Sequence, residues 1–331
     1  MKVFITGATG FIGGHLARQL AQAGHELYCL ARKTSDRQSL QELGVHLVEG
    51  TVNDLTALQE GMKGCQAVVH LANVYSFWEP DMRILHRANV DGTRAVMQAA
   101  AAAGVKRMVY VSTAAVYGVP QERPFNEGTP HAPHLTTTYA RTKRQAEEIV
   151  HQVAAKHGME LVVLQPGAVI GAGDTRATGQ YLQELLEGRL PLMSFHKTQM
   201  NFIHVLDVCD AVQHSLERPE LAGQTFLLGG TQMTMWQYLE MISEISGAHL
   251  PYLRFPVIVP TILGWVLTPL AHVTGRPPIW GLSNDQVRML RDGFWFDGSK
   301  AERELGIHYR SVRQAVAEAV AWYWELKQEE K

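Results

Sequence analysis

The chain has 331 residues, a length that suits one large domain or two closely joined domains. Its net charge of −2 excludes a broad basic surface of the kind that binds nucleic acid. Its three cysteines, Cys29, Cys65 and Cys209, are too far apart for a metal site or a disulfide framework, which favours a reducing, cytoplasmic compartment. Nothing at the start resembles a signal peptide, and no uninterrupted apolar run reaches ~18 residues, so we expect no transmembrane segment.

Strands and helices alternate through the first half of the chain. Short apolar runs predict strands, and longer amphipathic runs predict helices. In chain order we expect strands over Val3–Thr6, Glu26–Ala31, Val45–Glu49, Ala67–Leu71, Arg107–Ser112 and Glu160–Gln165, and helices over His15–Ala23, from about Leu55, over Val90–Ala103 and over Tyr139–His157. The repeated βα units predict an α/β fold with a doubly wound parallel sheet.

This alternation ends near Gly167. The segments Asn201–Val205 and Thr225–Leu228 still have the composition of strands, so we expect the chain to return to the sheet there. The pattern predicts a dinucleotide-binding region over 1–166 and 202–229. A smaller, mostly helical substrate-binding region over 167–201 and 230–331 is expected to cover the carboxyl ends of the strands, where ligands bind in such sheets.

Three evenly spaced glycines follow the first strand in TGATGFIGGHLARQL. Between a buried strand and a helix, the first glycine permits a tight turn, the second lets the backbone approach a pyrophosphate, and the third lets helix and strand pack closely. The helix N-terminus then offers unpaired N–H groups to the phosphates. The spacing differs from G-x-G-x-x-G, but the context predicts a Rossmann-type site. Its expected contacts are Gly7, Thr9, Gly10, Phe11, Ile12 and Gly13.

The residue at the end of the second strand indicates which dinucleotide binds. An NAD site usually has a carboxylate there, ~20 residues past the glycines, for the ribose 2′-hydroxyl. This chain has Arg32 followed by Lys33, and a guanidinium at that place pairs with a 2′-phosphate. The sequence therefore favours NADP, with NAD as the alternative if both side chains form only a solvated strand end.

Tyr139 and Lys143, in TYARTK, lie four residues apart on one face of a predicted helix. An ammonium group and a cationic nicotinamide both favour the phenolate, so the phenol can act as an acid in carbonyl reduction and as a base in alcohol oxidation. Lowering its pKa from ~10 to ~7 needs ~4 kcal/mol. The preceding strand ends at Ser112 and Thr113, whose hydroxyls can polarise a substrate carbonyl.

At this point the sequence resembles the extended short-chain dehydrogenase/reductases, and among them bacterial dihydroflavonol-reductase-like and hopanoid-associated epimerase-like proteins. The motifs that carry the resemblance are TGATGFIG, VYVSTAAVYG, YARTK, HLAN at 70–73, NVDGT at 89–93, PGAVIG at 166–171, NFIHVLDV at 201–208 and GSKAERELG at 298–306. The resemblance implies hydride transfer at a nicotinamide, with Tyr139 as acid/base and Lys143 as its partner. Thr113 is then the catalytic hydroxyl, with Ser112 as the alternative, and Asn89 orders the active-site helix and its proton path.

The same resemblance implies further cofactor contacts and exposes two departures. The implied contacts are Leu71, Ala72, Pro166, Gly167 and Val169. Thr51 stands where an aspartate often holds adenine. The adenine contact would then come from Thr51 and the backbone N–H of Val52. Asp54 is expected to cap the next helix. Gln165 stands where many members carry an arginine.

The motifs also separate branches of the family. Dehydratases of this kind carry an Asp-Glu pair after the catalytic threonine, whereas this chain has Ala114–Ala115, so 4,6-dehydration is not expected. We expect an NADP(H)-dependent oxidoreductase acting on an apolar or aromatic small molecule. The alternative is an NAD-dependent sugar-nucleotide epimerase with tightly bound cofactor. A binding module without chemistry is disfavoured by the intact Thr113, Tyr139 and Lys143.

Three features bear on the substrate. In NVYSFWEPD, residues 73–81, the aromatic side chains of Tyr75, Phe77 and Trp78 either line the cleft or pack a loop on the core. His204 is a candidate substrate contact, with Asp207 expected to cap a helix. His131 and His134 lack metal-binding neighbours, so no metal is expected.

The apolar segment 256–275 and two helices bear on partners. The segment is expected to form a core or lid helix, with a membrane-surface contact or a mouth for a lipidic substrate as the alternative, although it has no Lys or Arg before Arg276. The helix Val90–Ala103 and the helix from Tyr139 resemble the pair that builds homodimers in this family.

Overall fold

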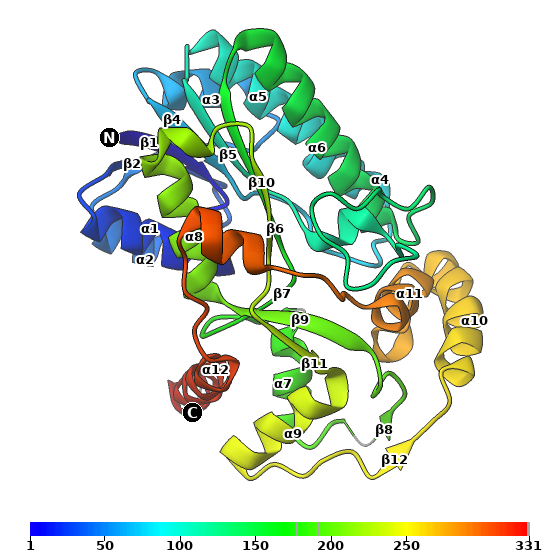
Figure 1. Ribbon diagram of the computed structural model, residues 1–331. Helices are drawn as coiled ribbons and strands as arrows, with labels where there is room; N and C mark the ends of the chain where they lie inside the picture. The colour runs from blue at the N-terminus through cyan, green and yellow to red at the C-terminus, as the bar shows by residue number, and fades with distance from the viewer. Residues whose placement is uncertain (177, 191, 330–331) are drawn as a thin grey trace.

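A seven-stranded parallel sheet forms the centre of the computed structural model, which describes residues 1–176, 178–190 and 192–329 (Figure 1). Its strands are β1 (Lys2–Thr6), β2 (Glu26–Ala31), β3 (His46–Glu49), β4 (Ala67–His70), β5 (Arg107–Val111), β6 (Glu160–Pro166) and β10 (Thr225–Leu228). They lie in the order β10-β6-β5-β4-β1-β2-β3, and neighbours are parallel throughout. The order reverses at β1, which confirms the predicted Rossmann-type doubly wound α/β fold.

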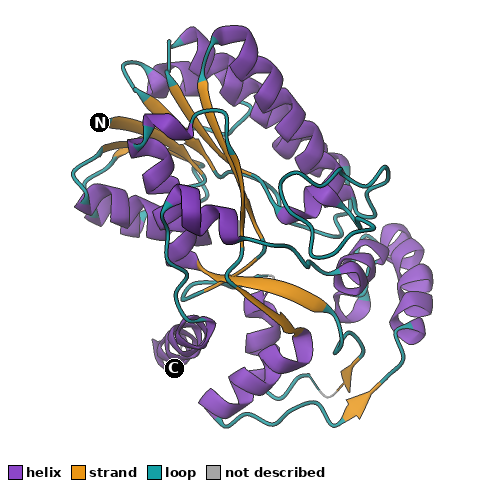
Figure 2. Ribbon diagram, in the orientation of Figure 1, coloured by secondary structure: helices purple, strands orange, loops and turns teal. Residues whose placement is uncertain are grey.

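Helices cover both faces of this sheet because its central strands β1, β4 and β5 are apolar on both sides (Figure 2). One face carries α3 (Leu55–Met62), α5 (Gly92–Ala102) and α6 (Thr138–His157), and the other carries α1 (Phe11–Gln22) and α8 (Val205–Glu217). Short helices α2 (Gln38–Glu42) and α4 (Arg83–His86) lie in the connections. Cys29, Cys65 and Cys209 are buried and free.

The rest of the chain builds a second layer below the carboxyl ends of the strands. A three-stranded sheet contains β7 (Ala168–Ile170), β9 (Gln199–His204) and β11 (Thr231–Thr234), and a two-stranded one contains β8 (Leu192–Met193) and β12 (Leu253–Arg254). Its helices are α7 (Thr178–Leu186), α9 (Met235–Ser246), α10 (Ile258–Thr274), α11 (Asn284–Asp292) and α12 (Val312–Glu329). Among the described residues, no helix is long and apolar enough to cross a membrane.

Three predicted elements differ from the observed ones. The first helix begins at Phe11 rather than His15, because glycines in its first turn hide the apolar spacing. The region predicted as one helix over Val90–Ala103 begins instead in a π-helical turn over Arg87–Asp91, followed by α5. Thr225–Leu228 returns to the main sheet as expected, but β9 pairs with β7 and β11 instead.

Candidate active site

The glycine-rich turn between β1 and α1 leaves very little room around its backbone. Gly7 has a φ of +80°, which glycine adopts without strain, and a Cβ there would lie 2.8 Å from the Ala72 nitrogen. A Cβ on Gly13 would lie 2.0 Å from the Gly7 oxygen, so the helix packs on the turn only with glycine at this position. Gly10 caps α1 without any side-chain acceptor, so the first N–H groups of the helix lack a partner of that kind.

These N–H groups include those of Phe11 and Ile12, which are half-buried, while Thr9 is exposed in the turn. They form a cradle that suits a pyrophosphate. The predicted contacts at the end of β4 lie beside it, because the Leu71 N–H donates to the Thr6 carbonyl and the Ala72 N–H donates to the Thr6 hydroxyl, both at 3.2 Å. The residues present therefore fit a dinucleotide.

Arg32 is exposed just after β2. Within the described ranges its guanidinium makes no hydrogen bond or ion pair. Arg37 of the same loop, by contrast, pairs with Glu49 at 3.0 Å. Arg32 is thus the arginine of this loop that remains available to a phosphate.

The turn after β3 carries the predicted adenine contacts. Thr51 is exposed and Val52 is half-buried. The Asp54 carboxylate accepts a hydrogen bond from the Ala57 N–H at 3.1 Å, which confirms that Asp54 caps α3. Asp54 is therefore occupied by the helix, and the turn offers an adenine the Thr51 hydroxyl and the Val52 backbone.

Pro166, Gly167 and Val169 lie where β6 ends and β7 begins. A Cβ on Gly167 would lie 2.4 Å from the Asn201 carbonyl oxygen, so β9 can pass this closely only because residue 167 is glycine. The preceding Gln165 donates to Glu147 of α6 at 2.9 Å. These three predicted cofactor contacts thus lie at or just after the carboxyl end of β6, which pairs with β5.

Tyr139 occupies the first turn of α6 and is 5% exposed. Burial raises the pKa of its phenol well above the ordinary value, and the Thr113 hydroxyl partly opposes this rise. Thr113 also accepts a hydrogen bond from the Ala115 N–H at 3.3 Å, so its orientation is fixed at the end of β5. The neighbouring Ser112 hydroxyl is buried without a partner among the described residues. The structure thus brings Tyr139 and Thr113 together, as the sequence predicted.

Lys143 lies one turn after Tyr139 and is also buried. Its ammonium group donates to the Val111 carbonyl at 2.9 Å and lies 4.5 Å from the centre of the Tyr110 ring. Burial lowers the pKa of Lys143 to about 7, and the carboxylate of Glu147 partly opposes this fall. The ammonium is therefore held at β5, beneath the strand end that carries Thr113.

Asn89 lies in the π-helical turn before α5 and is buried. Its amide accepts a hydrogen bond from the Val74 N–H at 2.7 Å and donates to the Val74 carbonyl and the Thr142 hydroxyl, both at 3.1 Å. Asn89 thereby ties the loop after β4 to the helix that carries Tyr139. These contacts suit the ordering role expected of Asn89, which stays a prediction together with its part in a proton path.

A buried chain of hydrogen bonds, which the sequence motifs do not predict, leads from Thr6 to Asn89. The Thr93 hydroxyl donates to the Asn89 carbonyl at 2.6 Å, so it must accept from His70 Nε2 at 2.9 Å. His70 Nδ1 then accepts from the Thr6 hydroxyl at 2.6 Å. Burial lowers the pKa of His70 to about 3, so the ring is neutral. His70 itself, a histidine at the end of an apolar strand, is the sequence feature that could have indicated this network.

Aromatic and apolar side chains surround the Tyr139 ring. Tyr75 meets it edge-on with ring centres 4.9 Å apart, and Phe77 lies at 6.1 Å. Leu85 and Met289 belong to the same cluster. Because Tyr75 is only half-buried and touches the candidate acid, the loop both packs on the site and presents an apolar ring to it.

Trp78 lies farther from the phenol, towards α10. It is half-buried, with its ring 5.9 Å from that of His272. Its indole Nε1 is buried without a partner in the described part of the chain. Trp78 therefore lies beside α10, and its substrate contact stays a prediction.

His204 is fully buried at the end of β9 and caps α8. Its Nδ1 accepts from the Leu206 N–H at 3.1 Å, and Nε2 faces Glu318 at 3.1 Å. The prediction that Asp207 caps this helix is wrong, because Asp207 accepts from the backbone and guanidinium of Arg310 instead. The substrate contact of His204 stays a prediction. Over 1–176, 178–190 and 192–329, no three potential metal-binding side chains gather.

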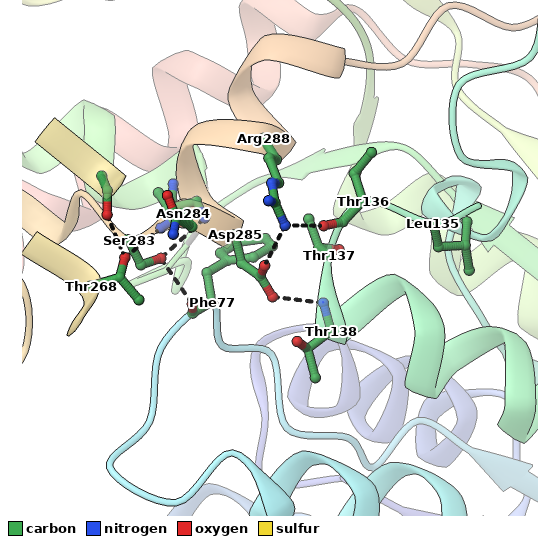
Figure 3. Close-up of polar contacts among 12 residues, drawn as sticks. Phe77, Leu135, Thr136, Thr137, Thr138, Thr268, Ser283, Asn284, Asp285 and Arg288 are labelled. Carbon is green, nitrogen blue, oxygen red and sulfur yellow. Dashed lines mark hydrogen bonds and ion pairs between the residues drawn. The ribbon is translucent and has the colours of Figure 1, made fainter. Parts of the chain in front are cut away.

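Helix α11 holds the N-terminus of α6 from the second layer, which sequence reasoning missed (Figure 3). Asp285 accepts a hydrogen bond from the Thr138 N–H at 2.6 Å, next to Tyr139. Arg288, one turn on, donates to the Thr136 carbonyl at 3.2 Å. A segment almost 150 residues away in sequence therefore fixes the start of the helix that carries the candidate acid.

With this geometry in place, comparison with known proteins decides the family. Residues 3–229 match the NAD dependent epimerase/dehydratase family. The chain belongs to this family. It is an NAD(P)-dependent oxidoreductase of the extended short-chain dehydrogenase/reductase type, as its motifs implied.

Three relatives within the family match almost the whole chain. The putative dihydroflavonol 4-reductase of Synechocystis sp. is 33% identical, over 97% of this chain and 94% of its own length. Sterol demethylase protein B of Methylococcus capsulatus is 30% identical, over 98% and 99%. The 4-hydroxy-2-methyl-3-oxo-4-farnesyl-3,4-dihydroquinoline-1-oxide ketoreductase of Stigmatella aurantiaca is 31% identical, over 97% and 96%.

A solved family structure has the same fold. The UDP-glucose 4-epimerase of Thermotoga maritima superimposes with a TM-score of 0.81, covering 99% of this chain and 100% of its own, at 18% identity. At this identity the likeness concerns the fold.

Proposed function

We propose that this family member uses NADP(H) to reduce a carbonyl group on an apolar or aromatic small molecule, or to oxidise the corresponding alcohol. The observation that carries the proposal is the surroundings of Tyr139. Its ring is enclosed by Tyr75, Phe77, Leu85 and Met289, so a substrate atom that reaches the phenol meets mainly carbon. A sugar would instead need convergent polar groups there.

The names of the relatives support this substrate class. One carries the name of a sterol demethylase protein, and another that of a ketoreductase for a farnesylated quinoline. Both names describe large apolar molecules, and the second names a ketone as the reacting group.

Each catalytic group has a defined task in this proposal. Thr113 holds the substrate oxygen, and Tyr139 gives it a proton during reduction or removes one during oxidation. The Lys143 ammonium stabilises the phenolate by its charge, while Asn89 holds the loop and helix on either side in place. A bound nicotinamide supplies or accepts the hydride.

The preference for NADP rests on Arg32, which follows β2 and whose guanidinium has no partner among the described residues. The division into two regions, the homodimer and the cytoplasmic location also stay predictions.

The test begins with extraction of the purified protein and identification of any retained nicotinamide. Absorbance of the reduced cofactor is then followed with a panel of aromatic and isoprenoid ketones, and with UDP-sugars as the matched polar set. We expect NADPH oxidation with members of the apolar panel. Tightly retained NAD, with interconversion of a UDP-sugar and no net cofactor turnover, would overturn the proposal in favour of an epimerase.

A further inference from the structure

Helix α10 lies beside α11 at the edge of the molecule (Figure 1), and its exposed side chains form an apolar face. Trp265 is 72% exposed and Val273 is 85% exposed. The spacing of the exposed residues places them on one side of the helix. The members of this outer face are Ile258, Ile262, Trp265, Val266, Leu270 and Val273.

The opposite face of α10 is closely packed on the protein. A Cβ on Gly264 would lie 3.2 Å from a methyl group of Val287 in α11, so the two helices approach closely at a small residue. The Thr268 hydroxyl accepts a hydrogen bond from the Asn284 N–H at 2.8 Å, which binds α10 to the start of α11 (Figure 3). The helix is therefore fixed with its apolar face outward and is not a loosely attached segment.

Helix α11 supplies the polar layer that α10 itself lacks. A helix that lies on a membrane usually has its own basic face opposite the apolar one. Here that side of α10 is taken by α11, which carries Asp285, Arg288, Arg291 and Asp292. Together α10 and α11 have one apolar side and one charged side, so α10 can lie on a membrane without a basic residue of its own.

The charges around α10 suit an anionic lipid surface. From residue 245 to residue 284 the sequence has no Asp or Glu, and its only basic residues apart from histidine are Arg254 and Arg276. Both are exposed and flank the helix in the sequence, and the guanidinium of Arg254 is held in place 3.8 Å from the centre of the Trp236 ring. Lipid phosphates would meet an arginine at each end and no carboxylate from this segment.

We propose that α10 docks the protein on the surface of a phospholipid bilayer, with its outer face among the upper acyl chains. A second copy of the chain suits this face less well. Whether the two helices ran parallel or antiparallel, the arginines of one copy would lie near those of the other, with no carboxylate from this segment to balance them.

Docking would also connect the membrane with the active site. Met289 of α11 contacts the cluster around Tyr139, the Ser283 hydroxyl donates to the Phe77 carbonyl at 2.8 Å, and His272 of α10 lies beside Trp78. An apolar substrate dissolved in the bilayer would then be concentrated next to the loop that surrounds the phenol. The docking itself does not depend on the proposed reaction.

The test is flotation of the full chain with vesicles of phosphatidylcholine alone and of phosphatidylcholine with phosphatidylglycerol. We expect binding to both, stronger with the anionic lipid. The double variant Trp265→Ser/Leu270→Ser should lower the partition coefficient at least ~10-fold on both, because two large apolar side chains lose their burial. Arg254→Ala/Arg276→Ala should remove only the preference for anionic lipid.

The matched control is Trp324→Ser, which removes another exposed tryptophan, on α12, and should leave flotation unchanged. Failure of the wild-type chain to float would overturn the proposal. The proposal would also be overturned if light scattering showed a dimer that Trp265→Ser/Leu270→Ser dissociates while binding to vesicles stays unchanged. Turnover of a water-soluble ketone by the double variant separates loss of docking from failure of the proposed reaction.

Discussion

The side chain of Lys143 is almost completely buried. Its pKa of about 7 lies far below the ordinary 10.5, so between these values the unfolded chain binds more protons than the folded one. The free energy of unfolding therefore rises with pH across that window. Burial of the amino group thus lowers stability below this window, and the catalytic role that we propose for Lys143 would explain why it is retained.

Replacing Lys143 by Met, which has a similar length, should separate these two effects. We expect Lys143→Met to be more stable than the wild-type protein at pH 7, by about 1–3 kcal/mol, because no charge remains to be buried. The difference should shrink as the pH rises towards 10.5, since the folded lysine is then already neutral and the free-energy cost of deprotonating the unfolded lysine falls. Urea unfolding at several pH values measures this. Exposed Lys156, at the other end of α6, is the control: Lys156→Met should change stability by less than ~0.5 kcal/mol.

The same pKa predicts a pH dependence of catalysis. The kcat/KM for ketone reduction should fall as the pH rises through about 7, because the ammonium of the free enzyme loses its proton there. Lys143→Met should have low activity at every pH. A flat profile across this range in the wild-type protein would show that the charge of Lys143 has no part in the reaction.

Arg32 determines the cofactor preference in our account. Arg32→Ala should weaken NADPH binding by ~10- to 100-fold and leave NADH binding nearly unchanged, because only the 2′-phosphate loses its partner. Fluorescence titration with both cofactors measures this, and Arg37→Ala, whose side chain is already paired with Glu49, serves as the control. Equal losses for the two cofactors would mean that Arg32 does not bind the 2′-phosphate.

Among the elements, we expect α11 to affect catalysis, because it holds the start of α6 although it lies far from it in the sequence. Asp285 holds the first turn of α6, so Asp285→Ala should lower kcat by ~10-fold through misplacement of Tyr139. The Kd for NADPH should change little, because Asp285 contacts the start of α6 and not the glycine-rich turn. Asp285→Asn, which keeps an acceptor, should recover most of the rate.

Asp292 lies at the other end of α11 and pairs with Arg291, so Asp292→Asn is the matched control for a general effect on this helix. An equal loss of kcat in both variants, or none in Asp285→Ala, would contradict a positioning role for Asp285.

Elements with strong apolar periodicity could be predicted from the sequence. The strands of the main sheet and the helix carrying Tyr139 were located nearly to the residue because each has a regular apolar pattern or a clear boundary. The π-helical turn at Arg87–Asp91 was missed because its hydrogen bonds, rather than its composition, distinguish it from an α-helix. The partners of β9 were wrong because composition shows that a strand exists but not which sheet it joins.

Over the whole molecule, the candidate site is assembled from segments that motifs identify only in part. Sequence motifs predict the glycine-rich turn, Thr113, Tyr139 and Lys143, because each belongs to a short pattern with its own chemistry. They do not predict the network through His70 or the contact from Asp285, because both depend on side chains that meet only after folding. The outward orientation of α10 likewise follows from packing against α11, since its sequence is apolar on nearly every side.

We infer that the Tyr139 phenol transfers the proton to or from the substrate oxygen. The most direct measurement is single-turnover NADPH oxidation with a ketone from the apolar panel, comparing the wild-type protein with Tyr139→Phe and with Tyr75→Phe, whose ring lies against that of Tyr139. We predict a loss of ~10³-fold in Tyr139→Phe with unchanged NADPH binding, and a loss below ~10-fold in Tyr75→Phe. A wild-type rate in Tyr139→Phe would contradict the account.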